Sequence, residues 1–246
     1  MKMFTIIGKY FVLMGNVFTK PVRPSIFFKR VLDEIEQIGV DSLWIVAIVS
    51  IFMGAVLTLQ VAINFEAPYI PKYLIGLSAR DTMILEFSST IICLILAGKV
   101  GSNIASEIGT MRITEQIDAL EIMGVNSAGY LILPKMIAAF LTFPVLNILS
   151  IILGIFGGYA VASFTDTVMV YDYLYGLNYA FVPFYVTYSL IKICVFSLII
   201  TSVSSFYGYY TYGGALEVGQ SSTKAVVYSI ILILLFNLIL TQLLLT

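Results

Sequence analysis

Five long apolar stretches dominate the pattern of hydrophobic and polar positions along the chain. A helix needs about 20 mostly apolar residues to cross the hydrocarbon of a bilayer. The five stretches cover residues 43–63, 82–98, 136–162, 180–207 and 225–246. The pattern therefore predicts an all-α integral membrane protein with five transmembrane helices.

The composition also indicates that lipid is the solvent for much of this chain. Of the 246 residues, 60% are hydrophobic and 11% are charged, whereas a soluble domain has about 25% charged residues. The net charge of −1 argues against nucleic acid as a partner. There is no histidine, and both cysteines, Cys93 and Cys194, lie in apolar runs. We therefore expect no metal site and no disulfide framework.

Residues 1–42 form a segment of different character, which we separate from the five-span domain at residues 43–246. Within it, one side of a helix would carry Phe28, Val31, Leu32 and Ile35. Such an amphipathic helix suits the membrane interface, with its basic residues near lipid phosphates. The alternative is a cytosolic helix packed on the protein's own loops.

Lysines and arginines are unevenly distributed between the two sides that five spans define. Ten fall on the side of the N-terminus, among them Lys20 and Arg23, and two fall on the other side. An excess of basic residues marks the cytoplasmic side of a membrane protein. We therefore expect a cytoplasmic N-terminus and a periplasmic C-terminus.

Small residues recur every four positions after the second apolar stretch, at Ala97, Gly101, Ala105 and Gly109. On a helix this spacing makes a stripe with almost no side chain, which allows another helix to approach closely. We expect the second helix to continue past the membrane surface, packed against a neighbour.

The segment at residues 115–124 predicts a short helix with one apolar and one acidic side. Thr114 can cap its start, and Gly124 suits its end. The apolar side would carry Ile113, Ile117, Leu120 and Met123, and the acidic side Glu115, Asp118 and Glu121. Two interpretations are open: a docking surface for a protein partner with basic residues, or a solvated acidic side on a helix that packs against the bundle.

Two ionisable residues, Glu86 and Lys192, lie inside predicted spans. A charge at the centre of a bilayer costs about 2.5–3.5 kcal/mol, so it usually faces a partner or a wet cavity. Both residues fall at similar depth, and we hypothesise that they face one polar cavity and can pair. A purely structural ion pair, or a lysine that extends to the interface, is the alternative. Further polar groups in or near the spans are Gln60, Asn64 and Asn237.

Nucleotide-binding motifs are absent from the sequence. There is no G-x-x-x-x-G-K-[ST] phosphate loop, so we do not expect this chain to hydrolyse ATP. Gly154 and Gly158 form a G-x-x-x-G pattern, but inside a predicted span this pattern indicates helix packing.

The run LAGKVGSNIASEIGTMRITEQIDALEIMG at residues 96–124 resembles the characteristic motif of the MlaE (YrbE) permease family. Weaker similarity extends from about residue 25 to the end of the chain. It includes FMGAVLTLQ at residues 52–60 and LIKICVF at residues 190–196.

This resemblance implies a permease subunit of an ABC transporter that moves phospholipids between the inner and outer membranes of diderm bacteria and contributes to outer-membrane lipid asymmetry. It implies a homodimer in the inner membrane that binds a separate ATPase subunit, which holds ATP and magnesium, and a periplasmic MCE-domain protein. It therefore implies no cofactor and no enzymatic activity in this chain.

The resemblance also implies two functional regions. The coupling helix that docks into the ATPase would comprise Glu115, Gln116, Asp118, Leu120, Glu121, Met123 and Gly124. The lipid cavity at the dimer centre would be lined by Leu57, Gln60, Val61, Asn64, Glu86, Lys192 and Asn237. Some relatives have an arginine where this chain has Leu85, and some have an acid at the position of Asn237.

Three other functions compete with this interpretation. An ion-coupled secondary transporter or channel would use Glu86 and Lys192 as an ion relay and would need no ATPase. An intramembrane lipid enzyme would need catalytic groups that the sequence lacks. A structural scaffold would hold the external protein without binding lipid.

Overall fold

The computed structural model describes residues 2–19, 24–65, 71–165 and 168–245. These residues are almost entirely helical, and no strand occurs among them. In chain order, the α-helices and the π-helical segments (η) are α1 (Lys2–Phe18), α2 (Pro24–Ile35), η1 (Glu36–Val40), α3 (Asp41–Asn64), α4 (Tyr73–Thr82), η2 (Met83–Ile91), α5 (Ile92–Leu96), η3 (Ala97–Gly101), α6 (Ser102–Ile113), α7 (Gln116–Ile122), α8 (Ser127–Phe164), α9 (Val170–Asn178), α10 (Phe184–Tyr209) and α11 (Ala215–Leu245).

Within the described ranges, five continuous helices are long and apolar enough to cross a bilayer. They are Ile26–Asn64, Tyr73–Ile113, Ser127–Phe164, Phe184–Tyr209 and Ala215–Leu245. The all-α, five-span prediction is therefore confirmed. The first of these helices has 39 residues, which corresponds to about 58 Å against a hydrocarbon thickness of about 30 Å. The apolar pattern predicts only the part of a helix that crosses the hydrocarbon. The helix continues into polar residues, because its backbone hydrogen bonds form there as well.

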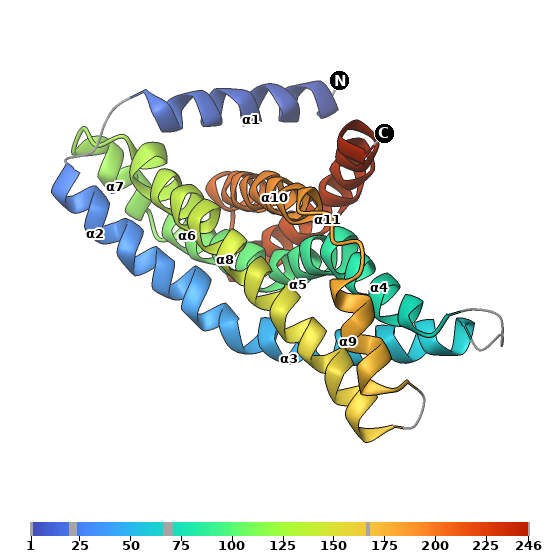
Figure 1. The fold of residues 1–246 in the computed structure, drawn as a ribbon. Helices are drawn as coiled ribbons and strands as arrows, with labels where there is room; N and C mark the ends of the chain where they lie inside the picture. The colour runs from blue at the N-terminus through green and yellow to red at the C-terminus, as the bar shows by residue number, and fades with distance from the viewer. Residues whose placement is uncertain (1, 20–23, 66–70, 166–167, 246) are drawn as a thin grey trace. The chain divides into compact units, whose positions relative to one another are not determined.

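The N-terminal region contains more helix than the sequence pattern indicated. The amphipathic segment forms α2, which continues through η1 into α3 without interruption (Figure 1). Phe28 and Leu32 are exposed on α2, and Val31 is buried. A separate helix, α1, precedes it, and its Tyr10 hydroxyl donates a hydrogen bond to Ser202 Oγ at 2.9 Å. Two residues used in the charge argument, Lys20 and Arg23, lie outside the described residues.

The chain divides into two compact units. The first comprises Met1–Ser42, Cys93–Phe143 and Cys194–Thr246, and the second comprises Leu43–Ile92 and Pro144–Ile193. Each unit has its own packing contacts and its own buried charges.

In the first unit, a buried lysine joins three helices. Lys135 of α8 is 2% exposed, and its Nζ lies 2.6 Å from Glu34 Oε1 of α2 and 2.7 Å from Glu107 Oε2 of α6. A buried ammonium needs such partners, because an unpaired charge loses its solvation. These ion pairs connect α6, the helix that precedes α7, to α2 and α8.

The small-residue stripe also lies in the first unit and makes close helix contacts, as predicted. A methyl group at Gly101 would lie 2.9 Å from Ser204 Oγ, and one at Gly109 would lie 3.3 Å from Val218. Ala97 and Ala105 are fully buried. The stripe is therefore filled by α10 and α11 of the same chain.

In the second unit, α3 and α8 touch through their backbones. A methyl group at Gly54 would lie 1.9 Å from the carbonyl oxygen of Gly154, and one at Gly157 would lie 2.1 Å from that of Ile51. The packing role predicted for Gly154 is confirmed.

A second helix pair in this unit, α4 and α9, lies side by side (Figure 1). Tyr173 of α9 is 1% exposed and donates a hydrogen bond to the carbonyl oxygen of Ile155 at 3.0 Å. Burial raises the pKa of Tyr173 to about 12. The hydroxyl therefore stays protonated and keeps this bond throughout the physiological pH range.

Candidate functional site

The two ionisable residues inside predicted spans form an ion pair in the second unit. Lys192 Nζ lies 3.0 Å from Glu86 Oε1 and donates a second hydrogen bond to the carbonyl oxygen of Leu85 at 3.2 Å. The lysine side chain is fully buried, and the glutamate side chain is 39% exposed. The hypothesis that these residues pair is confirmed.

Local structure explains why the pair can form inside apolar helices. Glu86 lies in η2, a π-helical segment, and such segments place a side chain off the regular helical positions. Thr90 donates a hydrogen bond to Glu86 Oε2 at 3.2 Å. The ammonium of Lys192 also lies over the ring of Tyr188, 4.7 Å from its centroid. The lysine charge is thus compensated on several sides, while the glutamate remains accessible.

The other predicted cavity residues differ in accessibility. Four lie on α3 in the second unit: Leu57 is buried, Val61 is half-buried, and Gln60 and Asn64 are exposed. Asn237 lies on α11, which belongs to the first unit. Gln60, Asn64 and Glu86 are therefore the predicted polar residues of the second unit that a ligand can reach without a rearrangement.

The predicted coupling helix is α7, and its two ends differ in how they form. Thr114 does not cap it, because its hydroxyl donates to the carbonyl oxygen of Thr110 in the preceding helix. The capping prediction is therefore wrong: Glu115 occupies the N-cap position in the left-handed conformation, with φ of 60°. The prediction for Gly124 is confirmed, since it has φ of 76° and its N–H donates to the carbonyl oxygen of Glu121 at 2.9 Å.

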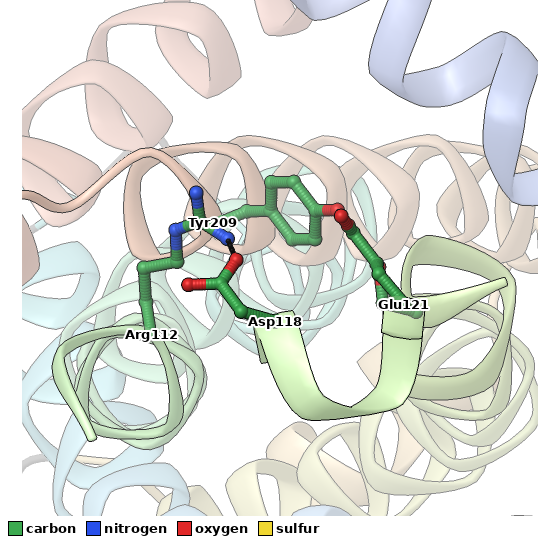
Figure 2. A network of polar contacts seen from close by, with 5 residues as sticks. Arg112, Asp118, Glu121 and Tyr209 are labelled. Atoms are coloured by element: carbon green, nitrogen blue, oxygen red, sulfur yellow. Dashed lines mark hydrogen bonds and ion pairs between the residues drawn. The ribbon is translucent and has the colours of Figure 1, made fainter. Parts of the chain in front are cut away.

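Two of the three acidic residues on this helix are bound by the chain itself (Figure 2). Asp118 Oδ1 lies 2.6 Å from Arg112 Nη1 of α6. Glu121 Oε1 accepts hydrogen bonds from the Tyr209 hydroxyl of α10 at 2.8 Å and from Ser127 Oγ of α8 at 2.9 Å. These contacts anchor α7 to three helices of the first unit. They also direct Asp118 and Glu121 toward the chain's own side chains.

Two large apolar side chains are exposed at the C-terminal end of α7. Ile122 is 88% exposed and Met123 is 68% exposed, whereas Ile117 is fully buried. Glu115 and Gln116 are exposed at the start of the helix, and Leu120 is half-buried. The residues predicted from the sequence for the coupling helix include Met123 but not Ile122. The position of Ile122 opposite the buried Ile117 was the available signal. Large exposed apolar side chains next to each other indicate an interaction site.

Known proteins resemble this chain along most of its length. The family model described as permease MlaE matches residues 31–243. A probable ABC transporter permease protein of Rickettsia bellii is 37% identical over 237 residues, which cover 96% of this chain and 91% of the relative. A probable ABC transporter permease protein of Synechocystis sp. is 34% identical over 233 residues, which cover 95% and 88%.

A plant protein is also similar. The chloroplastic protein TRIGALACTOSYLDIACYLGLYCEROL 1 of Arabidopsis thaliana is 29% identical over 231 residues, which cover 94% of this chain and 66% of the relative. The family match at residues 31–243 spans the positions of Glu86, α7 and Lys192 in this chain.

Proposed function

Because the chain belongs to the MlaE family and is a permease subunit of an ABC transporter, we propose that it moves phospholipids between the inner and outer membranes of a diderm bacterium. In this proposal it forms a homodimer in the inner membrane and contributes to outer-membrane lipid asymmetry. A separate ATPase subunit binds its cytoplasmic face, and an MCE-domain protein binds its periplasmic face. The name of the Arabidopsis relative contains a galactolipid, which supports lipid as the class of substrate.

The observation that carries the proposal is the exposed apolar pair, Ile122 and Met123, at the end of an anchored helix. A protein partner gains free energy by covering such side chains. The ion pair of Arg112 with Asp118 and the hydrogen bonds to Glu121 connect α7 to α6, α8 and α10. A force applied by the partner at Ile122 is therefore delivered to helices that belong to the spans.

The proposed mechanism is a change in lipid affinity between two states of the dimer. ATP binding draws the two ATPase subunits together, and α7 of each permease follows its own ATPase. Acyl chains contact apolar residues such as the half-buried Val61, and polar groups of the lipid contact Gln60, Asn64 and Glu86. ATP can drive lipid out of the site only if the second state binds lipid less tightly than the first.

The substitution Ile122→Asp tests the docking role of α7. A carboxylate in the centre of an apolar contact loses its solvation, and we expect the ATPase that copurifies with the permease to fall about tenfold or more. The measurement is the amount of ATPase retained by the affinity-purified permease, together with the ATPase rate of the complex in nanodiscs.

The conservative variant Ile122→Val serves as the matched control, because it keeps an apolar side chain at the same position. It should retain the ATPase, and both variants should elute as folded dimers. If Ile122→Asp retains the ATPase and its stimulation, α7 is not the docking site. Lipid transfer that continues without any ATPase would instead favour the ion-coupled alternative.

A further inference from the structure

A cavity of about 630 Å³, with both polar and apolar residues in its wall, lies within the first unit. Its size falls in the range of small-molecule binding sites, about 300–1,000 Å³. Residues from η1, the start of α3, η3, α6 and α11 line it, and all of them belong to the same unit. The residues that matter here are Gln37, Asp41, Lys99, Asn103, Ser106 and Ser222.

The cavity wall contains one positive and one negative charge, and neither has an ionic partner among the described residues. Lys99 Nζ donates a hydrogen bond to the backbone carbonyl oxygen of Asp41, so the two residues are neighbours. The ion pairs of the described chain involve neither the Lys99 ammonium nor the Asp41 carboxylate. The carboxylate repels a simple anion, and the ammonium repels a simple cation. A ligand that carries both charges satisfies both groups.

Neutral polar side chains complete the wall. Gln37 and Asn103 are exposed amides, and Ser106 adds a hydroxyl. Ser222 is 9% exposed, and its hydroxyl has no hydrogen-bond partner among the described residues. Such groups suit the ester and phosphate oxygens of a polar headgroup.

The cavity also lies where three predicted spans begin or end. Asp41 precedes the span at 43–63, Lys99 follows the span at 82–98, and Ser222 precedes the span at 225–246. Polar and apolar surroundings therefore meet at this place, and the buried side chains of Ile38 and Val100 form part of its lining. A ligand with a polar head and apolar chains fits these surroundings.

We infer that this cavity binds the zwitterionic headgroup of a phospholipid from the leaflet on the side of the N-terminus. The phosphate lies toward Lys99 and the ammonium of the headgroup toward Asp41. The inference rests on the proposed function for its substrate class. It assigns lipid binding to residues other than Glu86 and Lys192.

Photocrosslinking tests this inference in the full transporter complex. The variant Gln37→p-benzoylphenylalanine places a crosslinker in the cavity, and Gln220→p-benzoylphenylalanine places one on the exposed surface of α11 outside the lining. Both complexes are placed in nanodiscs with equal amounts of phosphatidylethanolamine and phosphatidylglycerol, and lipid adducts are identified by mass spectrometry after illumination. We expect enrichment of phosphatidylethanolamine at position 37 relative to position 220.

Two charge variants are made in the chain that carries p-benzoylphenylalanine at position 37. Lys99→Gln removes a charged donor and should lower the total adduct about tenfold. Asp41→Asn removes the repulsion of anions and should raise the share of phosphatidylglycerol.

Several outcomes overturn the inference. These are the same lipid ratio at positions 37 and 220, no response to Lys99→Gln, or a covalent protein dimer in place of the lipid adduct. ATP-dependent lipid transfer is measured in parallel. Lipid transfer without a selective adduct would reject only the proposed lipid site in this cavity. A selective adduct without lipid transfer would reject only the proposed function.

Discussion

At the scale of single residues, the pair of Glu86 and Lys192 shows what a charge needs in order to remain inside a membrane span. The ammonium has a carboxylate, a backbone carbonyl and an aromatic ring as neighbours. Removal of one partner from a buried pair costs about 3–5 kcal/mol, because the other charge is left uncompensated. Since Glu86 is 39% exposed, water or headgroups reach its carboxylate and reduce this cost.

We therefore expect Lys192→Met to lower the free energy of unfolding by about 2–3 kcal/mol. The double variant Lys192→Met/Glu86→Leu removes both charges and should recover most of this loss. The measurement is thermal unfolding of the detergent-purified protein, followed by tryptophan fluorescence. A double variant that is no more stable than Lys192→Met would show that the carboxylate is not the cause of the loss.

The pairing of Glu86 with Lys192 could be predicted from the sequence, because the ends of each apolar span show how deep a residue lies in the membrane. The same counting gives no depth for Lys135, which lies outside the predicted spans. Its contacts with Glu34 and Glu107 were therefore not predicted. The orientation of Asp118 and Glu121 toward their own chain was likewise not predictable, since Tyr209 and Arg112 come from other helices.

At the scale of secondary-structure elements, α7 is fixed by the way it ends. Gly124 adopts φ of 76°, a conformation that costs other residues about 1–2 kcal/mol. No atom lies within 4 Å of a methyl group at this position, so the cost of Gly124→Ala is conformational. We expect this variant to loosen the end of α7 and to raise hydrogen exchange of the amides at residues 120–125.

A matched control for this variant is Gly98→Ala. Position 98 also has no atom within 4 Å of the added methyl group, but its φ is not positive. This variant should leave hydrogen exchange in α7 unchanged, because a helical alanine is at least as favourable as a glycine. Equal exchange in both variants would mean that the left-handed turn does not hold α7 in place.

The backbone contact between α3 and α8 gives a second element-scale prediction. Gly54→Ala puts a methyl group 1.9 Å from the carbonyl oxygen of Gly154, and we expect a loss of about 3 kcal/mol or more, because neither backbone can move away locally. Gly8→Ala, where no atom lies within 4 Å, should be neutral. Differential scanning fluorimetry compares the two. Equal melting temperatures would contradict the contact.

The ends of the helices were predicted less accurately than the number of spans, for a physical reason. The length of an apolar stretch indicates where the hydrocarbon of the bilayer ends. A helix can continue beyond that point, as α2 and α6 do. Thr114 and Gly124 show the same difference at the scale of a cap. Only Gly allows the left-handed turn at low cost, so Gly124 was predictive, whereas the hydroxyl of Thr114 had a competing carbonyl acceptor in α6.

At the scale of the whole molecule, the uneven distribution of basic residues predicts a cytoplasmic α7 and a periplasmic α9. In a chain with Cys93 and Cys194 replaced by alanine, Ile122→Cys and Tyr171→Cys place single thiols at exposed positions. A membrane-impermeant maleimide should label position 171 in intact spheroplasts and position 122 only after disruption. The reverse pattern would invert the topology. Both should react in detergent.

The ion pair in the second unit also has a consequence for how the chain is made. Glu86 and Lys192 are 106 residues apart, so at about 5–20 residues per second the ribosome supplies the lysine about 5–20 s after the glutamate. During this interval the carboxylate has no ammonium partner, and its burial in hydrocarbon would cost more free energy than a position near water. The second span is therefore less stable in the membrane until the fourth span has been synthesised.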